Sequence, residues 1–134
     1  MDKREVMLEH YTNPFHFQKV SDDNFNAYSA NHTSCVDHIT IYVKVENDVI
    51  IDIYFDGEAC AICTSSASIL VKNIYGRTLK EATQFVSEVE NMIEQKEFEL
   101  EIVNEAIVYE DIYKQNNRKI CALLPYVAIK KLLF

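Results

Sequence analysis

The sequence predicts an α+β fold, in which a small antiparallel β-sheet packs against helices within a single domain covering residues 1–134. Three observations lead to this prediction. Two neighbouring segments alternate apolar and polar residues with the period of two that strands require, and the flanking segments repeat apolar residues at helical spacing. About half of the residues are apolar, and only two glycines and two prolines interrupt them, so the chain can bury one sizeable core.

The N-terminal part predicts a short helix followed by a polar segment. Over residues 3–12 the apolar side chains recur at helical spacing, and Asn13–Pro14 ends the pattern. Residues 15–34 are polar, irregular and rich in Asn, Asp and Ser. We expect them to form a mobile surface segment without regular structure.

A β-hairpin is predicted next. The segments HITIYVKVEN (38–47) and DVIIDIYFDG (48–57) alternate β-branched and polar residues, with a polar turn at Glu46–Asp48. Cys35 lies just before the first strand, and Cys60 lies just after the second. Because antiparallel strands return to the same end of a sheet, we expect these two thiols to lie close together.

Two helices should follow the hairpin. Residues 61–75 have helical spacing, and Gly76 suits the left-handed position that often ends a helix. Thr78 and Glu81 form a capping box that opens an amphipathic helix reaching about Gln95.

The C-terminal third is less regular. Residues 96–117 are mixed, acidic and aromatic; we expect helix or turns over 100–113 and a loop at KQNNR (114–118). The segment CALLPYVAIKKLLF (121–134) predicts an apolar helix, with Pro125 tolerated in its first turn because the missing amide would be unpaired there.

Composition and charge exclude several classes of function. The formal net charge of −8 and the lack of a basic tract argue against nucleic acid and favour a partner with a basic docking face. The apolar runs are shorter than the roughly 20 residues that cross a bilayer, and the N-terminus lacks a signal-peptide hydrophobic region. We therefore expect a soluble cytoplasmic protein without membrane association.

The four cysteines, Cys35, Cys60, Cys63 and Cys121, are too few for a disulfide scaffold. In a reducing compartment they point to metal or sulfur chemistry, although each could simply be a small buried apolar residue. Cys60 and Cys63 form a CxxC motif. At this point the motif could be a redox pair, half of a zinc site, or one working cysteine beside a bystander.

The positions of three cysteines suit metal binding. Cys60 lies at the start of a predicted helix and Cys121 just before another, where the helix dipole lowers a thiol pKa. Cys35 and Asp37 form a Cys-x-Asp sequence at a strand entrance, which can direct both side chains to one centre. Three thiolates and one carboxylate suit tetrahedral zinc or part of an iron–sulfur cluster site. Asp37 could instead be a solvated strand-end carboxylate or a cap.

Four motifs together resemble the U-type iron–sulfur cluster assembly proteins, the relatives of IscU and of the NifU N-terminal domain. In chain order they are LEHYTNP near the start, CVD before the hairpin, GEACAICTSSAS at the strand-to-helix turn, and RKIC before the last helix. The resemblance covers nearly the whole chain and implies a SufE/NifU-like fold. The long spacing from Cys60 to Cys121, with Ile120 and Arg118 preceding the last cysteine, is similar to the SufU branch.

The resemblance also implies a site and an activity. It assigns the metal, zinc in SufU-like proteins, to Cys35, Asp37, Cys60 and Cys121. Cys35 would accept persulfide sulfur from a SufS-like cysteine desulfurase and pass it toward iron–sulfur acceptor proteins, making the chain a zinc-dependent sulfurtransferase. A flexible loop, which the polar segment 22–34 could supply, would let a ligand leave the metal. Arg118 would supply positive charge near the developing thiolate.

In SufU relatives a serine occupies the position of Cys63, so the resemblance makes Cys60 the working residue of the CxxC motif and Cys63 a bystander. Val36 stands where the family has glycine, and Ala59 replaces a second glycine. His32 and His38 flank Cys35, and either could replace Asp37 as a ligand.

Two alternative functions stay open. One is a scaffold that assembles a transient [2Fe–2S] cluster and transfers it, with Asp37 as a weaker, lability-tuning ligand. The other is a metal-stabilised interaction domain without transfer activity, since a β-branched residue such as Val36 fits poorly where the backbone needs a positive φ.

Overall fold

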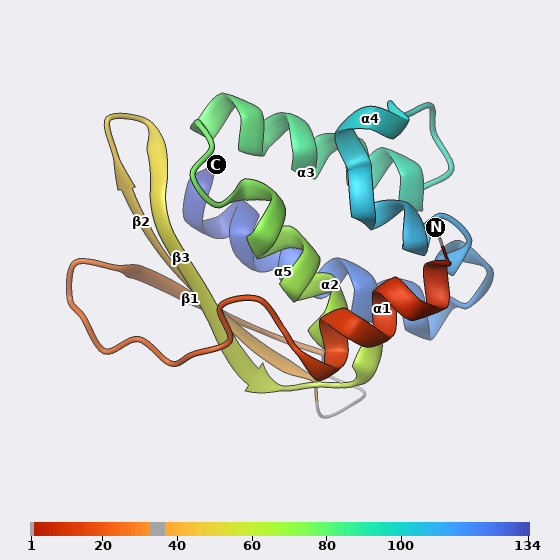
Figure 1. Ribbon diagram of the computed structural model, residues 1–134, viewed down its shortest axis with the longest axis horizontal. Coiled ribbons are helices and arrows are strands. Elements are labelled where there is room, and N and C mark those ends of the chain that lie inside the picture. Colours follow the sequence, from red (N-terminus) through yellow and green to blue (C-terminus); the bar gives the residue numbers. More distant parts are fainter. Residues whose placement is uncertain (1, 33–36) are drawn as a thin grey trace.

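The computed structural model describes residues 2–32 and 37–134, and it gathers the helices on one side of a three-stranded sheet (Figure 1). The predicted α+β class, with a small antiparallel sheet packed against helices, is confirmed. In the described part of the chain, none of the helices combines the length and the apolar character that crossing a bilayer requires. From the N-terminus the elements are α1 (Lys3–Thr12), β1 (Asn26–Asn31), β2 (His38–Glu46), β3 (Val49–Glu58), α2 (Ala61–Ile74), α3 (Leu79–Ile93), α4 (Leu100–Val103), the 3₁₀ segments η1 (Asn104–Tyr109) and η2 (Ile112–Lys114), and α5 (Asn116–Leu133).

The predicted hairpin is confirmed as β2 and β3. Glu46 pairs with Val49, which leaves Asn47 and Asp48 as a two-residue loop with φ angles of 51° and 60°. Positive φ at both positions is the type I′ geometry that matches the twist of antiparallel strands, and Asn and Asp tolerate it. At its other end the hairpin returns the chain to the start of β2, and this return positions the candidate site.

Strand β1 is an edge strand that the sequence pattern did not predict. It pairs antiparallel with β2, so the sheet order is β1-β2-β3, and the expectation that residues 15–34 lack regular structure is wrong over 26–31. Only Ala30 of its six residues is buried, so the strand carries no apolar alternation. Backbone hydrogen bonds to β2 hold it, together with a 2.6 Å hydrogen bond between the Ser29 and Thr40 hydroxyls.

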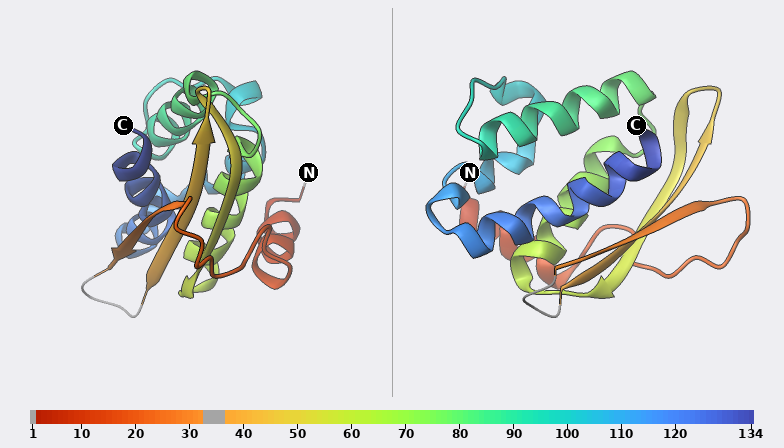
Figure 2. Two further views of the ribbon diagram at one scale, coloured as in Figure 1. Left: turned by 90° about the vertical axis from the view of Figure 1, so that its left-hand side faces the viewer. Right: turned by 180° about the vertical axis from the view of Figure 1, so that it is seen from behind.

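Helices α2 and α5 cover the sheet and enclose the core with it (Figure 2). Most of the largest fully buried side chains come from the sheet and from α2 and α5; among them are Ile39, Ile41, Ile53 and Phe55 from the strands and Ile69, Leu70, Tyr126 and Ile129 from the helices. The helical layer thereby places the first turn of α2 and the second turn of α5 at the end of the sheet where β2 begins.

The predicted starts and stops of the helices after the hairpin are confirmed. Gly76 follows α2 with a φ of 76°, the left-handed conformation that terminates helices. Thr78 and Glu81 make both hydrogen bonds of the capping box that opens α3.

The last helix begins five residues earlier than expected. The helix and turns expected over 100–113 are confirmed, but the predicted loop at 114–118 is wrong from Asn116 onward, because α5 begins there. Pro125 therefore lies inside the helix, where it lacks the N–H that would bond to the carbonyl of Cys121. Burial of α5 against α2 and the sheet outweighs this loss.

Candidate metal centre

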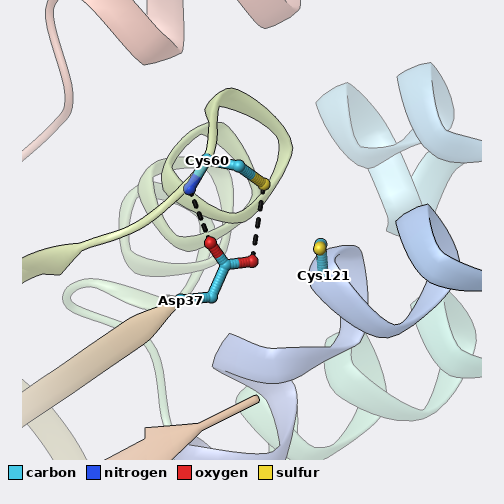
Figure 3. Close-up of side chains that lie close together, drawn as sticks. All are labelled: Asp37, Cys60 and Cys121. Carbon is cyan, nitrogen blue, oxygen red and sulfur yellow. Dashed lines mark hydrogen bonds between the residues drawn. The ribbon is translucent and has the colours of Figure 1, made fainter. Parts of the chain in front are cut away.

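Three predicted ligands converge at one end of the sheet. Asp37 precedes β2, Cys60 begins α2 and Cys121 lies in α5 (Figure 3). One ligand atom from each side chain lies within 4.8 Å of the others. Residues far apart in the chain thus bring two sulfurs and a carboxylate to one point.

Asp37 links the sheet to the first turn of α2. The hairpin pairs His38 with Glu58, so the chain after β3 returns directly beside Asp37. The side chain of Asp37 is buried, and its Oδ1 accepts a 2.7 Å hydrogen bond from the backbone N–H of Cys60. Its Oδ2 accepts a 3.5 Å hydrogen bond from the Cys60 thiol. Asp37 is therefore not a solvated strand-end carboxylate.

Cys60 is the N-cap residue of α2. Its backbone is extended, with φ −66° and ψ 169°, and its Sγ accepts a 3.4 Å hydrogen bond from the backbone N–H of Cys63. This sulfur lies at the N-terminal end of α2, where its side chain is available as a metal ligand. The predicted placement of Cys60 at a helix start is confirmed, and its side chain is half-buried.

Cys121 has a different environment from the one predicted. Since α5 begins at Asn116, Cys121 lies within the helix, and no N-terminal amides face its thiol. Burial, followed by the Asp37 carboxylate and Cys60, raises the pKa of the Cys121 thiol well above its ordinary value. A carboxylate and two sulfurs in a buried position repel one another when ionised, so the cluster favours a bound cation, which would stabilise the thiolates.

Buried hydroxyls on α2 hold the elements of the site together, a role that sequence analysis missed. Ser66 donates a 2.6 Å hydrogen bond to the carbonyl of Ala122, next to Cys121. Ser65 bonds to the Tyr109 hydroxyl at 2.6 Å, and Ser68 contacts α1 through a 2.7 Å hydrogen bond to His10. The run TSSAS, on a helix that must be buried, was the signal in the sequence that could have indicated this role. A buried hydroxyl requires a hydrogen-bond partner, so these side chains had to contact neighbouring elements.

The remaining predicted site residues are Cys35, Arg118 and the alternative ligands His32 and His38. Cys35 and Val36 lie outside the described residues. Arg118 is exposed on the first turn of α5 and takes part in none of the ion pairs between described residues. His38 is exposed and bonds to the Asn31 side chain, and the cluster found among the described residues contains no histidine, so His32 and His38 do not replace Asp37 there.

Known proteins are similar to this chain over nearly its whole length. The family model of the NifU-like N terminal domain matches residues 2–122. The iron–sulfur cluster assembly scaffold protein IscU of Thermotoga maritima is 30% identical over 129 residues, which cover 96% of this chain and 90% of that protein. The zinc-dependent sulfurtransferase SufU of Bacillus subtilis is 29% identical over 129 residues, which cover 96% and 86%.

Solved structures share the fold. A protein of Fervidobacterium islandicum AW-1, described as an iron–sulfur cluster assembly scaffold for the SUF system, superposes with a TM-score of 0.85 at 27% identity, covering 95% of this chain and 93% of that one. A NifU-like N-terminal protein of Brucella abortus has a TM-score of 0.84 at 20% identity, covering 95% and 88%, a likeness that shows the fold alone.

Proposed function

This chain belongs to the family of NifU-like N-terminal domains, and from that premise we propose that it is a zinc-binding sulfur acceptor that takes persulfide sulfur from a cysteine desulfurase. The family comprises iron–sulfur cluster assembly proteins of the IscU and SufU type. The observation that carries the proposal is the cluster of Asp37, Cys60 and Cys121, in which Asp37 and Cys121 are buried and Cys60 is half-buried, with ligand atoms within 4.8 Å of one another.

The donor set supports zinc. Zinc takes thiolate sulfur and carboxylate oxygen in a tetrahedral arrangement, and the three clustered residues would supply three of its four positions. We assign the fourth to Cys35, which precedes Asp37 by only two residues, so covalent geometry keeps the two Cα atoms within about 7 Å of each other. The spacing before Cys121 and the zinc-dependent relative support a SufU-like role.

The sulfur transfer uses the thiol of Cys35. Its thiolate attacks the outer sulfur of the desulfurase persulfide, a new S–S bond forms at Cys35, and the desulfurase cysteine leaves as a thiolate. Zinc, when bound, keeps its coordinating thiols deprotonated at neutral pH. Arg118, three residues before Cys121 on an exposed turn, would attract the anionic persulfide and the departing thiolate.

A second candidate function is a scaffold for a [2Fe–2S] cluster. The same cluster of two sulfurs and a carboxylate favours it, as does the Thermotoga relative, which is named as a scaffold. A carboxylate binds iron less tightly than a thiolate, so Asp37 would make such a cluster labile and transferable. Partners in either case are a SufS-like cysteine desulfurase and iron–sulfur acceptor proteins.

The experiment combines metal analysis with desulfurase turnover. Protein purified without added metal should contain near-stoichiometric zinc, lost in Cys35→Ala, Asp37→Ala, Cys60→Ala and Cys121→Ala but retained in the matched control Cys63→Ser. The wild-type protein should raise the turnover of a SufS-like desulfurase, and Cys35→Ala should not. Unchanged turnover with the wild-type protein would refute the sulfur relay.

The alternatives give different results in the same preparation. Anaerobic addition of iron and sulfide should yield a stoichiometric, transferable chromophore if the protein is a scaffold, and none with zinc in place if it is a relay. Zinc binding without stimulation and without a chromophore would identify a metal-stabilised interaction domain.

A further inference from the structure

Cys63 is a buried thiol that lies one helical turn from Cys60 and outside the cluster of described ligands. Its side chain is 0% exposed, whereas Cys60 is half-buried at the end of α2. No disulfide joins the described cysteines. Cys63 therefore presents its sulfur to the interior, where solvent and external reagents do not reach it.

The local geometry brings the two sulfurs toward each other. The Sγ of Cys60 folds over the first turn and lies 3.4 Å from the backbone nitrogen of Cys63. Helical side chains lean toward the N-terminus, so the side chain of Cys63 leans toward Cys60. Positions three apart place their Cβ atoms about 5–6 Å apart, and a disulfide needs about 4 Å. As N-cap, Cys60 has an extended backbone outside the helix and can close this difference.

A buried phenol packs against the same part of α2. The Tyr109 hydroxyl lies 2.6 Å from the Ser65 hydroxyl, two residues after Cys63. Burial chiefly raises the pKa of Tyr109; the hydrogen bond with Ser65 lowers it, and Cys63 and Cys60 raise it. The first turn of α2 that carries both cysteines is therefore enclosed by η1 on its inner side.

We propose that Cys60 and Cys63 form a reversible disulfide when Cys60 holds no metal, with Cys60 as the reacting thiol and Cys63 as the resolving thiol. A hydroperoxide is the oxidant. The Cys60 thiolate attacks one peroxide oxygen, the O–O bond breaks, and Cys60 becomes a sulfenic acid as hydroxide leaves. The Cys63 sulfur then attacks the Cys60 sulfur, the S–O bond breaks, and the Cys63 proton leaves with the hydroxyl as water.

The two sulfurs together supply the two electrons that reduce the peroxide. A dithiol reductant of the thioredoxin class restores both thiols by exchange. Cys121 also lies near Cys60, within the 4.8 Å cluster, but it belongs to α5. A disulfide from Cys60 to Cys121 would join two packed helices, whereas a disulfide from Cys60 to Cys63 stays within the first turn of α2.

The disulfide would exclude a metal from Cys60. Metal occupancy and oxidation therefore compete for the same sulfur, so that metal protects Cys60 and oxidation releases metal. This competition rests on the proposed metal site, whereas the disulfide itself does not.

Peptide mapping tests the disulfide directly. Trypsin cleavage after Lys44 and Lys72 yields a fragment, residues 45–72, that contains Cys60 and Cys63 and no other cysteine. The full chain, stripped of metal with a chelator and treated with stoichiometric hydrogen peroxide, should lose two thiols per molecule, both within this fragment. The fragment should lose two hydrogen atoms in mass and regain them with dithiothreitol.

The matched control is Cys63→Ser, which keeps the backbone N–H that bonds to Cys60. Its fragment should form no internal disulfide, and with a second equivalent of hydrogen peroxide Cys60 should proceed to sulfinic acid, which dithiothreitol does not reverse. A wild-type disulfide joining fragment 45–72 to fragment 120–130, which carries Cys121, or to fragment 20–44, which carries Cys35, would overturn the proposal. Circular dichroism of each protein checks that it is folded.

The competition is measured on the same protein loaded with zinc. When the free zinc concentration is about ten times the dissociation constant, the metal-free fraction of the protein falls about tenfold. The initial rate of disulfide formation should fall by the same factor. Protein that carries the Cys60–Cys63 disulfide should take up zinc only after dithiothreitol has reduced it. Equal rates of disulfide formation with and without bound zinc would refute the competition and leave the disulfide standing, and failure to bind zinc at all would refute the proposed function separately.

Discussion

Cys60 and Cys121 are the same residue type at one candidate site, yet the protein surrounds them differently. Cys60 caps a helix, accepts a backbone N–H and is half-buried. Cys121 lies inside a helix and is 5% exposed, and burial, followed by the Asp37 carboxylate and the Cys60 sulfur, raises its pKa. One sulfur accepts a backbone hydrogen bond at the start of a helix, and the other is enclosed in surroundings that disfavour its ionisation.

The surroundings of Cys121 indicate how its thiol depends on a metal. Cys121 remains protonated at neutral pH unless a cation offsets the nearby negative groups. The candidate site thus includes one sulfur, that of Cys121, whose ionisation depends on a bound cation.

The largest expected effect is the loss of stability when metal is removed. Zinc bound by both thiols favours the folded state by about 4 kcal/mol when its free concentration is a thousandfold above the dissociation constant. The free energies of unfolding of zinc-loaded and chelator-stripped protein, measured by urea denaturation, should differ by about this amount. The Cys121→Ala variant should show no such difference. Equal stability of the two wild-type forms would contradict a shared metal ligand role.

The second prediction concerns pH and metal-free protein. The folded-state pKa of Cys121 is raised, so between pH about 8.5 and 9.5 the unfolded chain loses its Cys121 proton while the folded chain keeps it. The folded state then binds more protons, and the free energy of unfolding falls by up to about 1.4 kcal/mol per pH unit. Denaturant midpoints across this window measure the effect, and subtracting the Cys121→Ala profile isolates it. A wild-type profile parallel to that of the variant would count against the environment described for Cys121.

The third prediction tests the hydroxyl that fixes α5 beside α2. Ser66→Ala removes the 2.6 Å hydrogen bond to the Ala122 carbonyl and should lower stability by about 1–2 kcal/mol. Because Cys121 adjoins this contact, zinc affinity should fall as well. Ser68→Ala is the control, since it removes a buried hydroxyl that contacts α1 and should lower stability while leaving zinc affinity unchanged. If the two variants bind zinc with equal affinity, the Ser66 hydrogen bond does not help to position the metal ligands.

The smallest expected effect concerns the cap of α2. In metal-free protein Cys60→Ser should keep the N-cap interaction and Cys60→Ala should lose it, a difference of about 0.5–1 kcal/mol in thermal or urea unfolding. Both variants should bind zinc equally poorly, so the difference reports the cap alone. If serine stabilises no more than alanine, the hydrogen bond from Cys63 does not support Cys60.

Local patterns were sufficient for the part of the site built from the hairpin and α2. Alternation over β2 and β3 and the polar turn predicted that the chain returns to its starting end, and helical spacing placed Cys60 at a helix start. These signals lie within a few residues of the elements they describe, so the meeting of Asp37 and Cys60 follows from them. The predicted role of Cys35 lies outside the described residues and stays a prediction.

The same patterns failed where packing decides. Strand β1 pairs through backbone groups and buries only Ala30, so its side chains carry no strand signal. Helix α5 begins at Asn116 without a side-chain cap, so its start has no local signature, and Pro125 indicated a later one.

By itself the sequence determined the family and most of the elements that carry the proposed donor residues, and it predicted which residues those donors are. Only the tertiary structure decided that Cys121 is a buried thiol beside a carboxylate, that Ser66 anchors its helix, and that Cys63 turns its sulfur inward next to Cys60. The physical reason is distance: helix and strand signals act between neighbouring residues, whereas pKa values and ligand geometry depend on a few ångströms between segments far apart in the chain.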